Sequence, residues 1–436
     1  MIPSSVKKYL DTRGLCGLWK IAGTQQGGFE GAVVIPSLAE TDFLFTTLHA
    51  LAQNPSELLQ RFLIVVVVNH REDAPLSAKM DNHQTLQRLA ARKPSLDNLH
   101  LAWVDAASSG LELPKKTGGV GLARKIGMDL ALPRFDYEKV TPLLISLDAD
   151  TLVRPDYLSA LIRHFQDAKV SGAVIPFCHQ PGSTPEEDRA IKRYELFLRA
   201  YVLGLSRAGS PYAFHTVGSA MACSAQAYVR MGGMNGRAAG EDFYFLQQLA
   251  KTGGISKVKG TVVYPSPRAS HRVPFGTGHS ITRLLAGEKE AVMFYQTACF
   301  QILEEWLALI ARNLDAPGEE IRVKAERISK DLGAYLDSIR FRSVWEKLQK
   351  NFRDRATLLP GFHSWFDGLK TMKLVHHLSA GPLPRCEPDE TLPELFQWAG
   401  LEPVKEIEEQ LTLLREMQIG EDYNFNCGIR IVAPIA

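Results

Sequence analysis

Two carboxylates one residue apart are the feature of this sequence with the clearest chemical meaning. Asp148 and Asp150 follow the apolar run 143–147, which is typical of a buried strand that ends at the edge of a sheet. At such an edge one aspartate can bind a hard divalent cation while its neighbour holds a ligand hydroxyl, and the cation can neutralise a diphosphate. The alternative is that the pair only ends the strand and caps the next helix, whose start is indicated by residues 154–156.

Other polar segments follow predicted strands or open a predicted helix. Because the carboxyl ends of parallel strands meet at one edge of a sheet, we expect the loops after the first strands to lie beside the two aspartates. The segments are residues 36–40 after a strand at 31–36, residues 69–73 after a strand at 62–68, the turn 232–235 followed by the acidic helix start 240–242, and residues 268–272 after a strand at 260–265.

The elements that position these residues alternate along the chain. Strand patterns separated by helical patterns predict an α/β fold with a mostly parallel central sheet and helices on both faces. We expect an N-terminal leader over residues 1–30 packed on an α/β domain at 31–280, and a mostly helical C-terminal region at 281–436. The remaining predicted strands are 99–104, 143–148, 171–176 and 216–224, and the predicted helices of the domain are 41–52, 122–132, 186–205 and 240–251.

Composition excludes several classes of protein. The chain has 436 residues and a formal charge of +2, which argues against a nucleic-acid partner. The six cysteines are scattered without a Cys-x-x-Cys pair, which argues against a zinc site and a disulfide framework. No apolar run is long enough for a transmembrane segment, and the start lacks the apolar core of a secretory signal. We expect a cytoplasmic protein, with peripheral association with a membrane left open.

The order of these motifs resembles that of glycosyltransferase family 2, whose members have the GT-A fold, a Rossmann-like α/β fold. The resemblance covers approximately residues 32–280. It departs from the family pattern at Ala39, Asn69 and Lys125, where Asn, Asp and Asn are usual. The matching motifs are Val-Val-Ile-Pro at 33–36, Ala-Arg-Lys-Ile-Gly at 123–127, Asp-Ala-Asp at 148–150, Gly-Gly-Met-Asn at 232–235 and Gly-Glu-Asp at 240–242.

This resemblance implies a site for a nucleotide-diphosphate sugar and a divalent cation, Mn²⁺ or Mg²⁺. Asp150 and His271 would bind the cation together with Asp148, which would also face the nucleotide. The residues implied in donor binding are Pro36, Ser37, Glu40, Asn69, Arg124, Lys125, Asp148, Arg268 and Arg272. A surface role for His271 and a solvated role for Lys125 are the alternatives.

The resemblance also implies a catalytic pair. Asp242 would be the general base that takes the proton of an acceptor hydroxyl, and Glu241 would orient the acceptor. Acidic residues at a helix start also stabilise the helix dipole, which is a structural explanation of the same pair.

The predicted activity is transfer of a single sugar from a UDP- or GDP-linked donor to a hydroxyl of a sugar, glycan or lipid-linked acceptor, with inversion. Neither the Gln-x-x-Arg-Trp segment nor the membrane helices of processive synthases occur in the sequence. Retaining transfer and a catalytically silent scaffold on the same fold are the alternatives. A dehydrogenase is disfavoured because no Gly-x-Gly-x-x-Gly follows the first strand.

Overall fold

The chain forms two compact units in a computed structural model that describes residues 1–15, 17–91, 94–168, 170–237, 239–270 and 276–420. Unit 1 comprises Met1–Ser183, Thr216–His279 and Glu416–Ala436, and unit 2 comprises Thr184–His215 and Ser280–Arg415. One change of unit falls between His279 and Ser280. The segment Thr184–His215 belongs to unit 2, whereas the predicted α/β domain at 31–280 includes it, and the predicted domain division stays a prediction.

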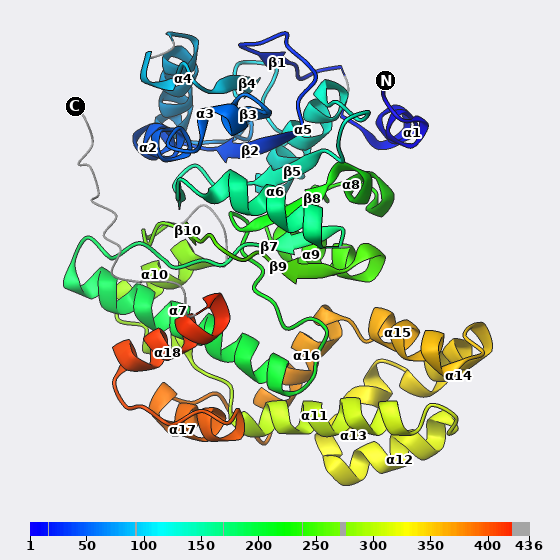
Figure 1. Ribbon diagram of the computed structural model, residues 1–436. Helices are drawn as coiled ribbons and strands as arrows, with labels where there is room; N and C mark the ends of the chain where they lie inside the picture. The colour runs from blue at the N-terminus through cyan, green and yellow to red at the C-terminus, as the bar shows by residue number, and fades with distance from the viewer. Residues whose placement is uncertain (16, 92–93, 169, 238, 271–275, 421–436) are drawn as a thin grey trace. The chain divides into compact units, whose positions relative to one another are not determined.

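Unit 1 is built on a sheet that has eight strands within the described residues (Figure 1). The order is β1-β4-β3-β2-β5-β8-β7-β9, in which β2, β3, β4 and β5 are mutually parallel neighbours and β8 runs antiparallel to both β5 and β7. The mostly parallel sheet predicted from the sequence is thereby confirmed. The strands are β1 (Ile21–Ala22), β2 (Gly31–Ser37), β3 (Phe62–Asn69), β4 (His100–Ala106), β5 (Leu143–Ser146), β7 (Gly172–Val174), β8 (Met221–Ser224) and β9 (Ile255–Lys257).

The centre of the sheet explains why its strands are so apolar. Every residue of β2 and β3 is buried, and the valine-rich sequence of both strands suits a parallel strand covered on its two faces. The chain proceeds from β2 through β3 to β4 and then returns to the other side of β2 with β5. The strand order therefore reverses between β2 and β5, and ligands of open α/β sheets bind at the carboxyl ends of the strands at such a point.

Helices of unit 1 pack closely on this sheet. Helix α5 (Val120–Ala131) contacts β2 and β3, and a Cβ added at Gly127 would lie 2.4 Å from Val34 Cγ1. The close approach fixes the start of α5 near the carboxyl edge. The other helices are α1 (Ser4–Arg13), α2 (Thr41–Leu51), α3 (Ser56–Leu59), α4 (Leu76–Ala91), α6 (Tyr157–Asp167), α8 (Ala225–Met231) and α9 (Glu241–Gly253).

A second, two-stranded sheet lies in the same unit. Strands β6 (Leu152–Val153) and β10 (Val263–Tyr264) pair antiparallel, with Tyr264 opposite Leu152. The strand predicted at 260–265 thus exists as two residues, and it pairs outside the main sheet. Its pairing carries the chain after Tyr264 toward the two aspartates that precede β6.

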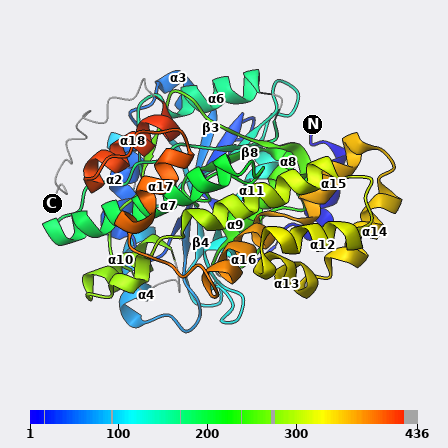
Figure 2. The same ribbon diagram turned by 90° about the horizontal axis from the view of Figure 1, so that it is seen from below.

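Unit 2 is helical and has its own aromatic core. Helix α7 crosses α11 closely, because Gly204 leaves room for the ring of Phe300, and the two helices lie together in both ribbon views (Figures 1 and 2). Trp306 on α11 is fully buried and makes edge contacts with Phe341, Phe362 and Phe366. The helices are α7 (Pro185–Arg207), α10 (Thr277–Leu285), α11 (Thr297–Arg312), α12 (Gly318–Ile328), α13 (Lys330–Ser338), α14 (Phe341–Asn351), α15 (Arg355–Trp365), α16 (Gly368–Ser379), α17 (Pro388–Trp398) and α18 (Ile407–Ile419).

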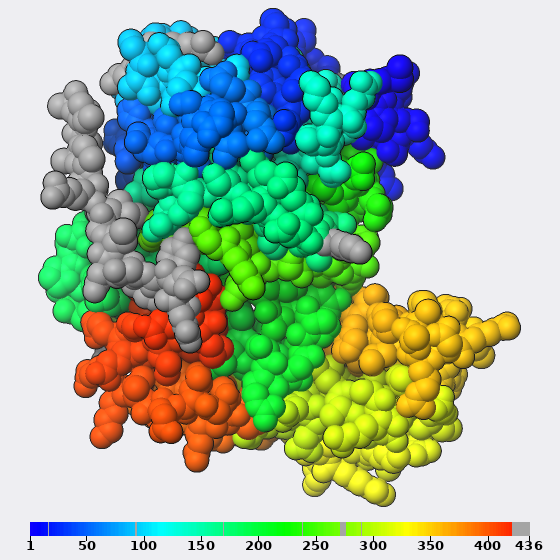
Figure 3. All heavy atoms as spheres, in the orientation of Figure 1, coloured from blue at the N-terminus to red at the C-terminus, as the bar shows by residue number. Residues whose placement is uncertain are grey.

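The surface of unit 2 is formed in part by the consecutive helices α12 to α15, drawn from yellow to orange in Figure 3. These helices contact one another in sequence order, with α12 against α13 and α14 and with α14 against α15. Across the part of the chain that the structure describes, no helix is both long enough and apolar enough to span a bilayer.

Candidate active site

The candidate site lies at the carboxyl edge of the sheet, where the strand order reverses. Glu40 follows β2, Asp148 and Asp150 follow β5, and Glu241 and Asp242 open α9. Two arginines bind four of these five carboxyl groups, all except Asp242. Each arginine binds two carboxylates that come from different parts of the chain.

Arg124 on α5 organises the first group, which we call the Arg124 cluster: Arg124, Ser146, Asp148 and Glu241. The guanidinium donates to carboxylate oxygens of Asp148 and Glu241, and its Nε donates to Ser146 Oγ at 2.9 Å. The Arg124 side chain is only 3% exposed, and burial alone would lower its pKa. The charges of Asp148 and Glu241 outweigh burial and raise that pKa, so Arg124 carries its charge at every relevant pH.

Close backbone approaches make room for this cluster. A Cβ added at Gly218 would lie 2.4 Å from Nη2 of Arg124, and one at Gly121 would lie 2.8 Å from the carbonyl oxygen of Asn235. Both glycines therefore act through the absence of a side chain. The predicted diphosphate contact of Arg124 stays a prediction, and the geometry adds a bracing role because its guanidinium already binds two carboxylates.

The two acids at the start of α9 are placed differently. Glu241 is buried in its ion pair with Arg124, and its backbone carbonyl accepts a hydrogen bond from Asn235 at 3.0 Å. Asp242 is partly buried, and its Oδ1 accepts a hydrogen bond from the backbone N–H of Phe243 at 2.7 Å. Burial and the neighbouring charge of Glu241 raise the pKa of Asp242 to about 7, although Arg124 opposes the shift. A carboxyl group with a pKa near 7 suits a general base.

Arg268 organises the second group, which we call the Arg268 bridge: Arg268, Glu40 and Asp150. Nη2 of Arg268 donates to an oxygen of Glu40 and also lies 2.8 Å from Oδ2 of Asp150, while its Nε donates to the same Oδ2 at 2.9 Å. The guanidinium stacks over the ring of Phe43 on α2, 4.4 Å from its centroid. Burial would lower the pKa of Arg268, but the charges of Asp150 and Glu40 outweigh burial and raise that pKa.

The small sheet positions Arg268 for this bridge. Pairing of β10 with β6 directs the chain after Tyr264 back toward Asp150. Gln180 fastens the two segments, since its Nε2 donates to the carbonyl oxygens of Asp150 at 3.0 Å and of Tyr264 at 2.7 Å. The backbone of Asp150 is therefore fixed independently of its carboxylate.

The predicted donor residues on β2 and β3 are buried in the strands. Pro36 and Ser37 end β2, and the carbonyl of Ser37 accepts from Nδ2 of Asn69 at 3.1 Å. The same amide nitrogen donates to the carbonyl of Val67 at 3.0 Å, so the Asn69 amide group is engaged by the backbone. A nucleotide contact through Asn69 remains a prediction. The amide nitrogen already donates to two backbone carbonyls, so it has little capacity to donate to a nucleotide.

His70 is a residue of the same edge that sequence reasoning did not select. It is 3% exposed, Asn82 Nδ2 lies 3.0 Å from its Nδ1, and Asn82 Oδ1 accepts from the backbone N–H of Ala39. The amide nitrogen must donate, so Nδ1 accepts and the proton of the neutral ring is on Nε2, which has no hydrogen-bond partner among the described residues. Burial lowers the pKa of His70 and keeps the ring neutral. Its position directly after the apolar run of β3 is the feature of the sequence that could have predicted a place at this edge.

Lys125 contacts different residues from those that Arg124 contacts. Its ammonium donates to Asp129 at 2.7 Å and to the hydroxyl of Tyr9 at 2.8 Å, and Asp129 also accepts from Tyr228 at 2.7 Å. This group ties α1 and α8 to α5. The diphosphate contact predicted for Lys125 is untested, but its charge is already neutralised by Asp129.

His271 and Arg272 lie outside the described residues, so their predicted roles stay predictions. Among the residues that the structure describes, no three His, Cys, Asp or Glu side chains are grouped to hold a metal ion. Two carboxylates, however, meet at Nη2 of Arg268, and carboxylate oxygens are the ligands that Mn²⁺ and Mg²⁺ accept. The donor set at that position fits a divalent cation.

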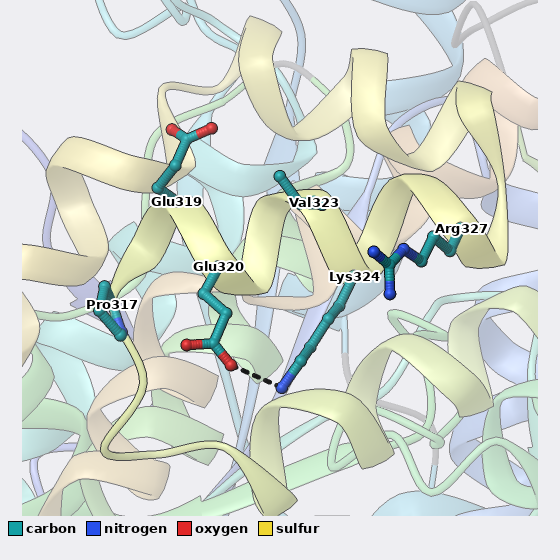
Figure 4. Close-up of a pocket in the computed structure, with 6 residues that line it drawn as sticks. All are labelled: Pro317, Glu319, Glu320, Val323, Lys324 and Arg327. Carbon is teal, nitrogen blue, oxygen red and sulfur yellow. Dashed lines mark ion pairs between the residues drawn. The ribbon is translucent and has the colours of Figure 1, made fainter.

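Two surface depressions lie apart from these residues in the chain. One, of about 440 Å³, is lined by Pro317 and five residues of α12, where Glu320 pairs with Lys324 at 2.7 Å (Figure 4). The other, of about 570 Å³, is lined by residues of α4. Neither depression contains a residue of the Arg124 cluster or the Arg268 bridge.

The structure combines an α/β sheet with paired carboxylates at the carboxyl edge of that sheet. Residues 143–286 match the family model described as glycosyl transferase family group 2, and this segment contains Asp148, Asp150, Asp242 and Arg268. The resemblance predicted from the motifs is confirmed over these residues, and the observed fold is the predicted α/β fold with a mostly parallel sheet.

Solved structures with detectable similarity are distant. TarS of S. aureus (residues 1–349) in complex with UDP-GlcNAc is 14% identical, with 74% of this chain and 92% of that chain covered and a TM-score of 0.40. The mannosyltransferase PcManGT from Pyrobaculum calidifontis in complex with GDP-Man and Mn²⁺ is 15% identical, with coverage of 96% and 93% and a TM-score of 0.37. At these TM-scores neither similarity supports a conclusion about substrate or metal. No curated protein sequence matches the chain significantly.

Proposed function

We propose that this glycosyltransferase moves a single sugar from a nucleotide-diphosphate donor to an acceptor hydroxyl, with inversion and with a requirement for Mn²⁺ or Mg²⁺. The observation that carries the proposal is the position of Asp242, which opens α9 beside Glu241, whose partner Arg124 also binds Asp148. Burial and the charge of Glu241 raise the pKa of Asp242 to about 7. A base of that strength beside a family 2 aspartate pair has the properties that inverting transfer needs.

In this reaction Asp242 accepts the proton of the acceptor hydroxyl while that oxygen bonds to the anomeric carbon and the bond to the diphosphate breaks. Glu241 is held by Arg124, so the base next to it is presented from a rigid helix start. Asp148, 35% exposed, keeps an accessible oxygen for a donor hydroxyl. A divalent cation bound by Asp150, with His271 as a further proposed ligand, would neutralise charge on the leaving diphosphate.

The residues proposed to bind the donor differ in the evidence that supports them. Arg268 and Glu40 are supported as donor-side groups by their contact with Asp150. The roles of Arg272, Lys125 and Asn69 rest on the sequence resemblance alone. We propose uracil or guanine as the nucleobase of the donor, and a hydroxyl of a sugar, glycan or lipid-linked sugar as the acceptor.

Transfer assays with a panel of UDP- and GDP-sugars and Mn²⁺ test the proposal, with NMR of the product anomer. Inverted product, loss of turnover in excess EDTA and recovery on addition of Mn²⁺ are the expected results. Asp150→Ala should abolish metal-dependent turnover, whereas Asp97→Ala, in the segment before β4, should leave it unchanged. Turnover that survives both chelation and Asp150→Ala would reject metal dependence, and a retained anomer would reject inversion.

A further inference from the structure

The Arg268 bridge holds two carboxylates that belong to opposite sides of the point where the strand order reverses. Glu40 comes from the loop after β2 and Asp150 from the loop after β5. One nitrogen atom, Nη2 of Arg268, contacts an oxygen of each. The positive charge of Arg268 therefore occupies the place where both carboxylate oxygens converge.

This position has the chemistry of a divalent-cation site. Two hard oxygen donors converge on one point, and the ligands come from loops at the ligand-binding edge of the sheet. Glu40 is 8% exposed, so its charge needs a cation nearby, while Asp150 and Arg268 are 21% and 22% exposed and remain in reach of solvent. An incoming ion can thus reach the bridge without unfolding of the loops.

We infer that the Arg268 guanidinium is an internal placeholder for the donor's divalent cation: it pairs with Asp150 and Glu40 until metal and diphosphate bind, and the metal then takes its position with Glu40 as a ligand. This inference rests on the proposed function. The charge balance changes from one positive charge shared by two carboxylates to two positive charges shared by the same pair. The released guanidinium is then available to the negatively charged diphosphate.

The exchange predicts coupling between metal and nucleotide. Metal that binds alone must displace Arg268 from both carboxylates and leaves the guanidinium without an anion. Metal that binds with a diphosphate gives the guanidinium a new partner, so each ligand increases the affinity for the other. The hydrogen bond from Gln180 to the carbonyl oxygen of Asp150 keeps the Asp150 backbone in place, so the exchange moves the guanidinium and not the loop.

The first test measures binding of Mn²⁺ alone to the full-length protein, by the EPR signal of free Mn²⁺. Arg268→Gln should lower the Kd for Mn²⁺ by about tenfold or more, because two ion pairs no longer compete with the metal. Arg268→Lys keeps the positive charge and should bind Mn²⁺ about as weakly as the wild type. An unchanged Kd in Arg268→Gln would overturn the inference.

Arg154→Gln is the matched control for loss of a positive charge near the site. Arg154 is similarly exposed, at 29%, and pairs with Asp156 at 3.0 Å in the loop after β6. Its substitution should leave the Kd for Mn²⁺ unchanged. An equal decrease in Arg154→Gln and Arg268→Gln would show a general charge effect and would also overturn the inference.

The double variant Arg268→Gln with Glu40→Gln tests the ligand role of Glu40. Its Kd for Mn²⁺ should return toward the wild-type value, since one carboxylate ligand is lost. A double variant that binds Mn²⁺ as tightly as Arg268→Gln alone would remove Glu40 from the site.

Isothermal titration of UDP and GDP, with and without saturating Mn²⁺, separates this inference from the proposed function. In the wild type Mn²⁺ should tighten nucleotide binding, and in Arg268→Gln the tightening should be smaller by about tenfold. Wild-type protein that binds neither nucleotide with Mn²⁺ would defeat the proposed function and the inference together. Metal-dependent nucleotide binding with the same tightening in both proteins would defeat the inference alone.

Discussion

The ion pairs around Arg124 give two neighbouring carboxyl groups different chemistry. Glu241 is neutralised and fixed by the guanidinium, whereas no arginine among the described residues forms an ion pair with Asp242. Burial and the charge of Glu241 therefore act on Asp242 more strongly than the attraction of Arg124, and its pKa rises to about 7. Glu241 is thus held by its ion pair with Arg124, and Asp242 is the proposed base.

For catalysis, we expect Asp242→Asn to lower kcat by about 10²- to 10⁴-fold while the donor-nucleotide Kd stays unchanged, because only proton transfer is removed. In the wild type, kcat/KM should rise with pH through an apparent pKa of about 7, since the base must be unprotonated. Glu57→Gln, an exposed acid on α3, is the control. A near-normal kcat in Asp242→Asn would exclude the residue as the base.

For stability, the raised pKa of Asp242 means that the folded state holds its proton more tightly than the unfolded chain does. The stabilisation is fully present below the unfolded pKa, near 4, and is lost as the pH rises through about 7. Asp242→Asn should therefore match the wild type near pH 4 and exceed its free energy of unfolding by on the order of 1–3 kcal/mol at pH 8. Urea unfolding at the two pH values measures this, and an equal difference at both would contradict it.

At the scale of elements, the site depends on how closely β8 and its preceding turn approach α5. Gly218 in that turn faces the guanidinium of Arg124, which cannot move aside because three groups hold it. Arg124 thus links the start of α9, the end of β5 and the turn before β8. Small changes in this turn should be transmitted to both Asp148 and Glu241.

Gly218→Ala tests this dependence. The added methyl group would lie 2.4 Å from Nη2 of Arg124, so we expect a loss of about 1–3 kcal/mol in unfolding free energy and a decrease of about tenfold in kcat. Gly236→Ala is the matched control, because a Cβ there meets nothing within 4 Å, and it should change stability by less than about 0.5 kcal/mol. Equal effects of the two substitutions would refute the packing argument.

At the scale of the whole molecule, the residues of the candidate site all belong to unit 1, and the largest buried aromatic side chains include several in unit 2. Each unit has its own core: the sheet in unit 1 and the packing around Trp306 in unit 2. Stability and chemistry are therefore distributed over different parts of the chain. A defect in the helical core should leave the donor site intact below the unfolding temperature.

Trp306→Ala tests that separation. Removal of the fully buried indole should lower the free energy of unfolding by about 3–5 kcal/mol, while the Kd for UDP or GDP with Mn²⁺ at low temperature should not change. Val323→Ala on the exposed face of α12 is the control and should be within about 0.5 kcal/mol of the wild type. Calorimetry and nucleotide titration give the two readouts. Loss of nucleotide binding in folded Trp306→Ala would show that the site depends on the helical core.

Sequence reasoning located the strands and the principal acids because both leave local signals. The valine-rich run before Asn69 and the apolar run before Asp148 correspond to β3 and β5, and the acidic helix start corresponds to α9. The same reasoning placed residues 184–215 with the sheet, whereas α7 packs with α11 in unit 2. An amphipathic pattern shows that a helix has a buried face but not which partner covers it.

The sequence by itself determined the class of fold, the family resemblance and the positions of Asp148, Asp150, Glu241 and Asp242, because periodicity and motif order are properties of neighbouring residues. Only the tertiary structure decided which charges meet. Arg268 pairs with Glu40 across 228 residues of sequence, and Arg124 pairs with Glu241 across 117. Such pairs depend on strand order, on the β6–β10 register and on the direction of each side chain, and these are set by the packing of the whole unit.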